Sequence, residues 1–462
     1  MNIVPVILAA GQGTRMRSAL PKVLHPLLGH PLVWYALESA RQITESKAVL
    51  VVGHGAAEVR QVIGDNARYV LQEPQLGTGH AVAQTEGLLQ AEADLVLVTY
   101  ADMPLLRSET LKRVIQAHQE EQRRQPGMTP LTMLTVIAND PRGFGRIVRN
   151  QDGEVQAIVE EHQATPTQLA IRELNPSIYC FTAQWLWKAL QRIPISPKGE
   201  YYLTDVVGIA VKDGFRVQAL PIEDINETIG INTRIHLAEA TAVLRQRINE
   251  KWMLAGVTLV DPQNTYIEPE VEIGQDTIIW PNTYLHGKTQ IGEACSLGPD
   301  TILYDSQIGN HCEILASVVE KAVVEDEVDI GPFSHLRKGT HLAQGVHIGN
   351  FGEIKNSYLG TGTKMGHFSY VGDATIGKEV NVSAGVITCN YDGKKKNPSI
   401  IGDGAFIGSD SMLIAPVNIG EGAITGAGSV VNKDIPAHTL AVGVPARVIR
   451  KLNPPDQDKD SR

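Results

Sequence analysis

The second half of the chain repeats an aliphatic residue followed by glycine at short, regular intervals. Successive pairs are mostly separated by six residues or a multiple of six, with occasional slips of one residue. The aliphatic members are Ile273, Ile291, Leu297, Ile308, Ile330, Ile348, Leu359, Val371, Ile376, Ile401, Ile407 and Ile419. In a parallel β-helix, three six-residue segments close one triangular coil, and the coils stack about 4.8 Å apart. The repeat over residues 271–431 therefore predicts a parallel β-helix.

The composition agrees with this architecture. Aromatic residues make up only 5% of the chain, whereas glycine occurs 43 times. The aliphatic residue of each hexad points into a narrow prism that has little room for aromatic rings, and this frequency of glycine excludes a helical repeat. The rest of the chain is expected to form a separate domain, because 462 residues exceed what one hydrophobic core supports.

The N-terminus carries a second strong signal. An apolar run from Ile3 to Ala10 leads into Gly11-Gln12-Gly13-Thr14-Arg15-Met16, and Lys22 follows Pro21. The run is typical of a buried parallel strand, and the glycines let backbone N–H groups approach an anion. Because Arg15 and Lys22 add two cations, the loop favours binding of a nucleoside triphosphate. It is neither a dinucleotide-binding loop, which needs glycine in place of Met16, nor a Walker A loop, which ends in Gly-Lys-Ser/Thr.

Apolar segments alternate with segments of helical spacing between Lys22 and Asp102. Buried strands are predicted at residues 48–52, 69–71 and 95–100. This alternation predicts a doubly wound α/β sheet whose ligands bind at the carboxyl edge of the strands. Asp102 lies at that edge, where its carboxylate could either bind Mg²⁺ or cap the following turn.

The residues of the N-terminal loop match the signature L-x-x-G-x-G-T-R-[ML] followed by P-K, so this half resembles the sugar-nucleotide pyrophosphorylases. The resemblance implies that Mg²⁺ is bound by Asp102 and Asn232, and that Gln72 reads uracil. Gly145, Glu160 and Asn175 would hold N-acetylglucosamine. The residues assigned in this way to UTP or the UDP-sugar are Leu8, Ala9, Ala10, Gly11, Arg15, Lys22, Gln72, Gly77, Thr78, Gly145, Glu160, Asn175 and Asn232.

A long helix is predicted between the two halves. Residues 234–254 lack proline and glycine and space Ile235, Ala238, Ala242, Ile248 and Trp252 along one side, which is typical of an amphipathic helix. We expect a pyrophosphorylase domain over residues 1–234, a linker helix over residues 235–255 and a β-helix domain over residues 256–462. The polar, proline-containing tail from about residue 453 is expected to be disordered.

Further motifs follow the order found in hexapeptide acyltransferases, namely Leu336-Arg337, Gly349-Asn350-Phe351 with Lys355, Gly366-His367 with Tyr370, Asn381, and Cys389-Asn390-Tyr391-Asp392-Gly393. Over residues 1–450 the chain resembles the bifunctional bacterial N-acetylglucosamine-1-phosphate uridyltransferases/glucosamine-1-phosphate N-acetyltransferases. The resemblance implies a left-handed β-helix that forms a homotrimer. It also implies acetyl transfer from acetyl-CoA to glucosamine-1-phosphate, followed by uridylyl transfer from UTP with release of pyrophosphate.

Acetyl transfer to an amine needs the amine unprotonated and therefore a base. We predict His367 for this role, because the pKa of histidine lies near the working pH. By resemblance, Arg337, Lys355, Tyr370 and Asn381 bind the sugar phosphate. By the same resemblance, acetyl-CoA is bound by Ala384, Asn390, Tyr391, Ser409, Ala427 and Arg447, although Val444 occupies the position where the family has its late arginine. The lysine run 394–396 interrupts the hexads and is predicted to be a solvated loop.

Several other classes of function are disfavoured. A formal charge of -10 argues against a nucleic-acid partner, and no apolar stretch is long enough to predict a membrane span. Four scattered cysteines and the absence of a leader pattern favour a cytoplasmic protein. His335, His341 and His347 could suggest zinc, but their spacing places them on successive faces of the prism. One alternative stays open, a single-function pyrophosphorylase whose β-helix is only structural or regulatory.

Overall fold

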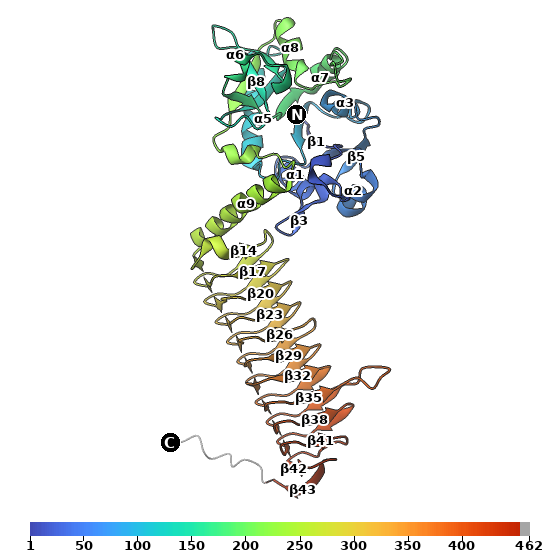
Figure 1. Ribbon diagram of the computed structural model, residues 1–462, viewed down its shortest axis with the longest axis vertical. Coiled ribbons are helices and arrows are strands. Elements are labelled where there is room, and N and C mark those ends of the chain that lie inside the picture. The colour runs from blue at the N-terminus through green and yellow to red at the C-terminus, as the bar shows by residue number, and fades with distance from the viewer. Residues whose placement is uncertain (453–462) are drawn as a thin grey trace. The chain divides into compact units, whose positions relative to one another are not determined.

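Figure 1 shows the computed structural model, which describes residues 1–452; the tail predicted to be disordered lies outside the described residues. The chain divides into two compact units, and the division falls after Leu244. The point of division lies within helix α9 (Arg234–Leu254). We call the two parts the N-terminal unit and the C-terminal unit.

One mixed sheet organises the N-terminal unit. Its strand order is β5-β4-β1-β6-β11-β7-β10-β8-β9, with β12 beside β7. The strands are β1 (Ile3–Ala9), β4 (Val49–Val52), β5 (Arg68–Leu71), β6 (Leu95–Tyr100), β7 (Leu131–Ile137), β8 (Gly145–Arg149), β9 (Val155–Val159), β10 (Glu173–Asn175), β11 (Tyr179–Thr182) and β12 (Val217–Pro221). Neighbouring strands from β5 to β6 are parallel, as the alternating pattern predicts, whereas β11 pairs antiparallel with both β6 and β7.

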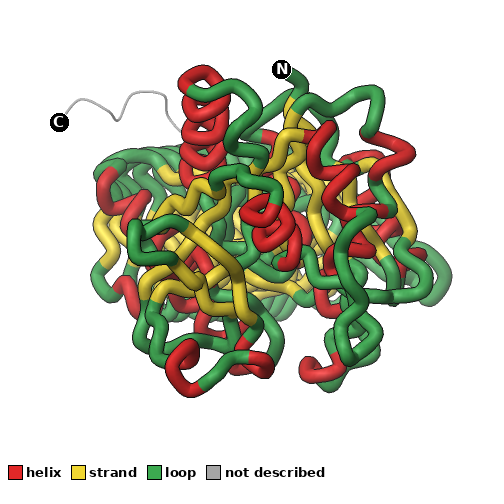
Figure 2. Tube along the Cα trace, turned by 90° about the horizontal axis from the view of Figure 1, so that it is seen from above, coloured by secondary structure: helices red, strands yellow, loops and turns green. Residues whose placement is uncertain are grey.

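Helices cover both faces of this sheet, as Figure 2 shows for the strands in yellow and the helices in red. Successive residues of β1 enter different cores, because side chains of a strand alternate between its faces. Val6 and Leu8 join one apolar cluster, and Ile7 and Ala9 join another. The helices are α1 (Leu32–Arg41), α2 (Ala56–Ile63), α3 (Thr78–Ala83), α4 (Glu86–Leu89), α5 (Ser108–Arg124), α6 (Pro166–Leu169), α7 (Ala183–Leu190) and α8 (Asp205–Lys212).

Helix α9 spans the predicted residues, but its apolar contacts differ from the single stripe expected. Ile235 is 78% exposed, whereas Leu237 and Ala240 pack in a core of the N-terminal unit. Ile248 and Trp252 instead join the core of the C-terminal unit. Because the two halves of the helix pack against different cores, the helix does not need one apolar stripe along its whole length.

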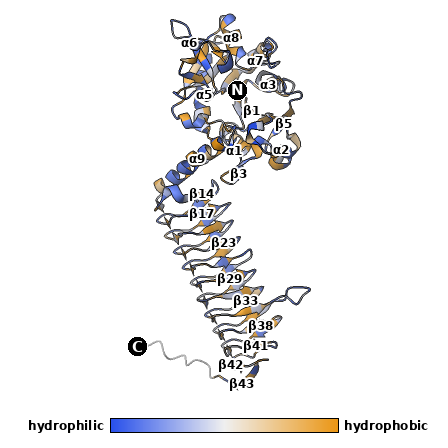
Figure 3. Ribbon diagram, in the orientation of Figure 1, coloured by the Kyte–Doolittle hydropathy of each residue, from blue (hydrophilic) through white to orange (hydrophobic). Residues whose placement is uncertain are grey.

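The C-terminal unit is the predicted stack of triangular coils (Figure 1). Its three parallel sheets are called here the first, second and third face, and they begin with β13 (Thr258–Leu259), β14 (Thr265–Ile267) and β15 (Glu272–Ile273). Later strands recur on the faces in the same order as far as β41 (Val430–Val431). Among the described strands of this unit, only the last pair, β42 (Thr439–Val442) and β43 (Arg447–Lys451), is antiparallel. Apolar and polar colours alternate along the coils in Figure 3 because one side of each strand faces the interior.

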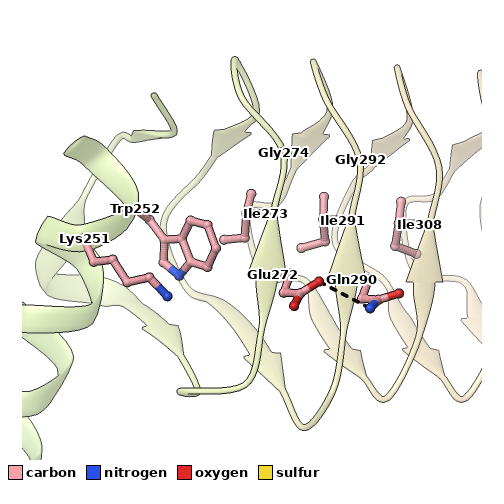
Figure 4. A pocket seen from close by; sticks show the side chains of 9 residues that line it. All are labelled: Lys251, Trp252, Glu272, Ile273, Gly274, Gln290, Ile291, Gly292 and Ile308. Atoms are coloured by element: carbon pink, nitrogen blue, oxygen red, sulfur yellow. Dashed lines mark hydrogen bonds between the residues drawn. The ribbon is translucent and has the colours of Figure 1, made fainter. Parts of the chain in front are cut away.

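Aliphatic side chains fill the interior of the prism. Figure 4 shows Ile273, Ile291 and Ile308 aligned along it, with the Trp252 indole beside Ile273 at the start of the stack. Trp252 is 9% exposed and covers the apolar end that the first coil would otherwise present to water. Glycine follows the aliphatic residue for a steric reason, namely the close approach of the next coil. A Cβ atom on Gly274, for example, would lie 2.5 Å from the carbonyl carbon of Gly292.

Candidate active sites

A cavity of about 520 Å³ opens at the carboxyl ends of β1 and β6 in the N-terminal unit. This is the sheet edge at which the sequence places a ligand. The predicted residues that line it are Leu8, Ala9, Ala10, Gly11, Arg15, Lys22, Gln72, Gly77, Thr78 and Asp102. Val23, Gln75, Ala81, Tyr100, Glu200 and Tyr202 complete the lining. Residues from five separate stretches of sequence therefore meet in one place.

The glycine loop after β1 is shaped by its contact with Lys22. Gly13 has a φ of 65°, a left-handed conformation that favours glycine. A Cβ atom on Gly13 would lie 2.6 Å from Cβ of Lys22, so the loop can pack on Lys22 only without a side chain there. Pro21 then leads into the short 3₁₀ turn Lys22–Leu24 that presents the lysine. The two parts of the Gly-x-Gly…Pro-Lys pattern are thus in direct contact.

Lys22 contacts both predicted metal ligands, Asp102 and Asn232. Its Nζ atom lies 2.5 Å from Oδ2 of Asp102 and donates to Oδ1 of Asn232 at 3.2 Å. The backbone N–H of Ile231 donates to the carbonyl oxygen of Asp102 at 2.8 Å, which fastens the loop of Asn232 to the end of β6. The side chains of Lys22 and Asp102 are 12% and 18% exposed. A carboxylate and an amide oxygen therefore converge on one cationic group in a partly desolvated site.

Gln72 lines the cavity with its side-chain nitrogen already engaged. Nε2 donates to the carbonyl oxygen of Gly77 at 2.9 Å and lies 3.2 Å from Nδ1 of His80. Burial lowers the pKa of His80, which favours the neutral ring that can accept this bond. The Gln72 carbonyl oxygen is the group left to interact with a ligand. Gln75, which sequence analysis missed, donates to the carbonyl oxygen of Ala10 at 2.6 Å and so ties this loop to the end of β1.

Gly145, Glu160 and Asn175, the predicted sugar-side residues, are not among the residues that line the cavity. Asn175 is buried, and its amide donates to the Tyr179 hydroxyl at 2.8 Å while accepting from the backbone of Ser177 at 3.0 Å. Gly145 pairs with Asn175 across the sheet. Glu160 accepts from the Thr204 hydroxyl at 2.9 Å.

Tyr100 was missed by sequence analysis. It is the last residue of β6, two positions before Asp102, and its hydroxyl lies near the side chains of Ser177 and Thr78. Burial is the main cause that raises its pKa. The position at the carboxyl end of a buried strand is the signal that could have identified it.

Three cations gather at one edge of the second face of the prism. Arg337 follows β26 (His335–Leu336), and Lys355 ends β29 (Gly352–Lys355), the next strand on that face. Arg337 forms an ion pair of 2.7 Å with Glu353. The ammonium group of Lys396 and then the guanidinium of Arg337 lower the pKa of Lys355. The lysine run 394–396 is exposed, as predicted for a solvated loop, and its last member, Lys396, also stands beside the predicted phosphate ligands. The lysine run was the signal available in the sequence.

The predicted catalytic histidine lies at another edge of the same face. His367, Ala384, Ser409 and Ala427 each follow by two residues the last strand residue of the first face, so they form a column at the corner between the first and second faces. His367 is exposed, and its ring has no hydrogen bond or ion pair within residues 1–452. Asn381 is adjacent on the first face in β34 (Asn381–Val382), and its amide donates to Ser383 at 3.0 Å.

The remaining predicted acetyl-CoA residues lie elsewhere on the prism. Asn390 and the exposed Tyr391 follow β35 (Ile387–Cys389), at the edge that carries Lys355. Tyr370 belongs to β32 (Ser369–Gly372) on the same face, and its hydroxyl reaches over Gly372 toward Asn390. Arg447 is exposed in β43, opposite Val442. Within one chain, most of the predicted acetyl-transfer residues therefore form two groups at opposite edges of the second face, whereas Arg447 lies at the end of the first face.

The three histidines considered for zinc lie on three different faces, as their spacing predicts. His335 is on the second face, His341 on the third and His347 on the first. Each ring contacts a carboxylate of the preceding coil, from Glu320, Glu325 and Asp329 respectively. No group of three or more His, Cys, Asp or Glu side chains in residues 1–452 is arranged to hold a metal ion.

Comparisons with known proteins give matches to both halves of the chain. A family model described as a MobA-like NTP transferase domain matches residues 5–131, and one described as bacterial transferase hexapeptide (six repeats) matches residues 398–433. The chain is 48% identical over 438 residues to the bifunctional protein GlmU of Heliobacterium modesticaldum, which covers 95% of this chain and 94% of the relative. It is 48% identical over 447 residues to that of Fervidobacterium nodosum, and 43% identical over 438 residues to that of Shouchella clausii. These matches cover 96% and 95% of both chains respectively.

Among the helices formed by residues 1–452, none combines the length and the apolar character that crossing a bilayer requires.

Proposed function

This chain belongs to the family of bifunctional GlmU proteins, and on that premise we propose how its two units catalyse two successive steps of UDP-N-acetylglucosamine synthesis. The C-terminal unit transfers the acetyl group of acetyl-CoA to the amine of glucosamine-1-phosphate. The N-terminal unit then transfers the uridylyl group of UTP to N-acetylglucosamine-1-phosphate and releases pyrophosphate. The observation that carries the second assignment is the convergence of Lys22, Asp102 and Asn232 at the glycine-loop cavity.

Uridylyl transfer requires that the charge of the triphosphate be held while the α-phosphorus is attacked. An oxygen of the sugar phosphate forms the new bond to phosphorus, and the bond to the pyrophosphate oxygen breaks. Arg15 and Lys22 line the cavity and supply positive charge for the pyrophosphate as it leaves. Backbone N–H groups of the Gly11–Gly13 loop offer further donors to phosphate oxygens. Leu8, Ala9 and Ala10 form the wall on which the nucleoside rests.

The residues of this site fit Mg²⁺. The ion prefers oxygen ligands and is commonly held by few protein groups together with substrate phosphates. Asp102 Oδ2 and Asn232 Oδ1 are two such oxygens, and they already converge on a cation, the Lys22 ammonium. When bound by Asp102 and Asn232, Mg²⁺ would neutralise phosphate charge.

The Gln72 amide supports selection of a uracil base. Because its nitrogen donates within the protein, its oxygen is left as an acceptor for the N3–H of uracil. Cytosine has no hydrogen at N3 and would leave this buried acceptor unpaired. Gly77 and Thr78 continue the same loop. Glu160, Asn175 and Gly145 would form the sugar side of the site together with Tyr100, whose hydroxyl lies near Thr78 and Ser177.

Acetyl transfer needs a base, a phosphate site and room for the thioester. The nitrogen of the sugar amine forms the bond to the acetyl carbon while His367 takes a proton from that amine. The carbon–sulfur bond then breaks and releases CoA as its thiolate, which takes up a proton. Arg337, Lys355 and Lys396 bind the phosphate, and Tyr370 and Asn381 bond to sugar hydroxyls. The small side chains of Ala384, Ser409 and Ala427 leave space for acetyl-CoA along the corner that begins at His367. Asn390, Tyr391 and Arg447 would contribute further contacts to acetyl-CoA.

A homotrimer would join the two edges that one chain holds apart. Phe333, Phe351 and Phe368 occupy successive coils at the corner of His367 and are 62%, 58% and 56% exposed. The rings of Phe333 and Phe351 stack at 5.5 Å. Exposed aromatic residues in a column favour contact with another copy of the chain. Light scattering should show a trimer that is weakened by Phe351→Ser. A stable monomer that still acetylates would contradict this assembly.

One assay tests the whole assignment. The protein is supplied with acetyl-CoA, glucosamine-1-phosphate, UTP and Mg²⁺, and free CoA, pyrophosphate and UDP-N-acetylglucosamine are measured. We expect all three, and we expect a chelator to stop formation of pyrophosphate and UDP-N-acetylglucosamine while release of CoA continues. If no CoA is released, but N-acetylglucosamine-1-phosphate added in a parallel sample is converted to UDP-N-acetylglucosamine, the result would instead support a structural β-helix. We further propose a cytoplasmic location, which four free cysteines support.

A further inference from the structure

Asp373 is a carboxylate beside the three cations of the C-terminal unit that the two reactions leave without a role. It follows β32 at the edge of the second face, and its side chain is 15% exposed. Oδ1 accepts a hydrogen bond of 2.6 Å from the amide of Asn356, which directly follows Lys355. Oδ2 accepts one of 2.6 Å from the amide of Asn390 and lies 3.9 Å from Nζ of Lys396.

These contacts fasten both ends of a projecting loop to the prism. The loop over residues 391–396 begins after Asn390 and ends at Lys396, so Asp373 contacts the residue before it and its last residue. Asp392 shapes the loop from inside, because its Oδ1 accepts from the backbone N–H groups of Lys394 and Lys395 at 2.8 Å each. The backbone N–H of Asp373 donates to the carbonyl oxygen of Lys355 at 3.1 Å. One residue thus connects the strand of Lys355 with the loop of Lys396.

Three cations close together repel one another unless a negative charge offsets them. Glu353 offsets the charge of Arg337, whereas Asp373 is the carboxylate that faces Lys396 next to Lys355. A carboxylate that accepts two amide hydrogen bonds can keep the lysines in place before the substrate phosphate arrives.

We propose that Asp373 is a positioning residue of the acetyl-acceptor site, which holds Lys396 beside Lys355 so that both bind the phosphate of the sugar. The proposal rests on the acetyl transfer assigned above. It assigns no contact between Asp373 and the reacting atoms. Its effect should therefore appear in the binding of glucosamine-1-phosphate and should depend on Lys396.

The test compares Asp373→Asn, Lys396→Met and the double variant in the full-length protein. Asparagine is chosen because Asp373 has a φ of 50°, a left-handed conformation that Asn and Asp tolerate better than other side chains with a Cβ. We expect Asp373→Asn to raise KM for glucosamine-1-phosphate about tenfold, the effect of one lost charge-assisted contact, with kcat changed less than about threefold. Lys396→Met should have a similar effect, and the double variant should be little worse than either alone.

Asp305→Asn is a matched control. Asp305 follows β20 (Ile302–Tyr304) in the same column, has a φ of 45°, and lies 3.8 Å from the ammonium of Lys321, but it is outside the predicted site. We expect this variant to leave KM for the sugar phosphate unchanged. Uridylyl transfer, measured on the same samples, should be unchanged in every variant.

Three results would overturn the proposal. The first is an unchanged KM in Asp373→Asn, and the second is a double variant in which the two effects multiply in full. The third is a loss of acetyl transfer in Asp373→Asn that is matched by Asp305→Asn or by a lower melting temperature. A wild-type protein without acetyl transfer would refute the underlying function instead, so the two failures are distinguishable.

Discussion

The two units build their sites from contacts of very different range along the chain. In the N-terminal unit, Lys22 meets Asp102 and Asn232 across 80 and 210 residues of sequence. In the C-terminal unit, Arg337 meets Glu353 across 16 residues, and Asp373 meets Asn356 and Asn390 across 17 residues each. The first site requires the whole sheet to be folded, whereas the second requires only neighbouring coils. A destabilising substitution should therefore disturb the whole N-terminal unit, whereas in the prism its effect should be confined to the neighbouring coils.

The largest expected effect separates the two chemistries. His367→Ala should lower the rate of acetyl transfer by a factor of about 10²–10⁴, the usual cost of a lost general base. Uridylyl transfer from added N-acetylglucosamine-1-phosphate should keep its rate, because its residues lie in the other unit. Both half-reactions and the melting temperature are measured on one preparation. Retained acetyl transfer with a lower melting temperature would mean that His367 only packs between coils.

The complementary variant is Asp102→Asn. Replacing the carboxylate removes the negative charge that faces Lys22 and the stronger of the two predicted ligands for Mg²⁺. We expect uridylyl transfer to fall by a factor of about 10²–10³, comparable to the loss of one electrostatic group in an active site. Acetyl transfer should be unaffected. Titration with Mg²⁺ checks the assignment, since undiminished turnover in excess chelator would be incompatible with it.

The third prediction tests whether damage in the prism is local. Trp252→Ala should destabilise the first coils by about 3–5 kcal/mol, as truncation of large buried side chains usually does. Hydrogen exchange should accelerate from β13 to β18 (Gln290–Ile291), while the strands near His367 stay protected. Trp252→Phe, which keeps a ring at the end of the stack, serves as the control. Uniform loss of protection along the whole prism would show that its coils unfold together.

The smallest predicted effect is the acid sensitivity of the N-terminal unit. His118 lies between the hydroxyls of Thr132 and Thr182, each 3.1 Å from one ring nitrogen. Thr132 donates to Gln218 at 2.8 Å, so it accepts from the ring, which must then accept from Thr182 through its other nitrogen. Burial lowers the pKa of His118 to about 4.

Because the folded-state pKa of His118 lies below its ordinary value of 6.5, this residue stabilises the unit fully above pH 6.5. The stabilisation, about 3 kcal/mol at most, is lost as the pH falls from 6.5 toward 4. Calorimetry should show the melting temperature of the N-terminal unit falling over this interval. His118→Gln, whose amide keeps both a donor group and an acceptor without a titrating ring, should flatten the dependence. An equal slope in wild type and variant would exclude His118 as the cause.

The sequence determined most of the architecture on its own. A hexad acts locally, because each aliphatic residue and its glycine specify one strand and one corner. Repetition of that unit predicts a parallel β-helix. The Gly-x-Gly…Pro-Lys pattern likewise identifies its loop because Gly13 and Lys22 are in contact within one short segment. The carboxyl edge of the sheet follows from strand alternation, which placed Asp102 correctly at the cavity.

What the tertiary structure alone decided is how polar groups are shared. Asp102 and Asn232 converge on Lys22, the Gln72 nitrogen is already occupied, and Lys396 stands beside Lys355. Likewise, α9 uses different apolar residues in its two halves. None of these follows from periodicity, because hydrogen bonds and ion pairs depend on side-chain positions to within a fraction of an ångström, and long-range folding sets those positions. Repetition fixes the backbone of the C-terminal unit, whereas the chemistry of both units depends on side-chain contacts that no periodicity predicts.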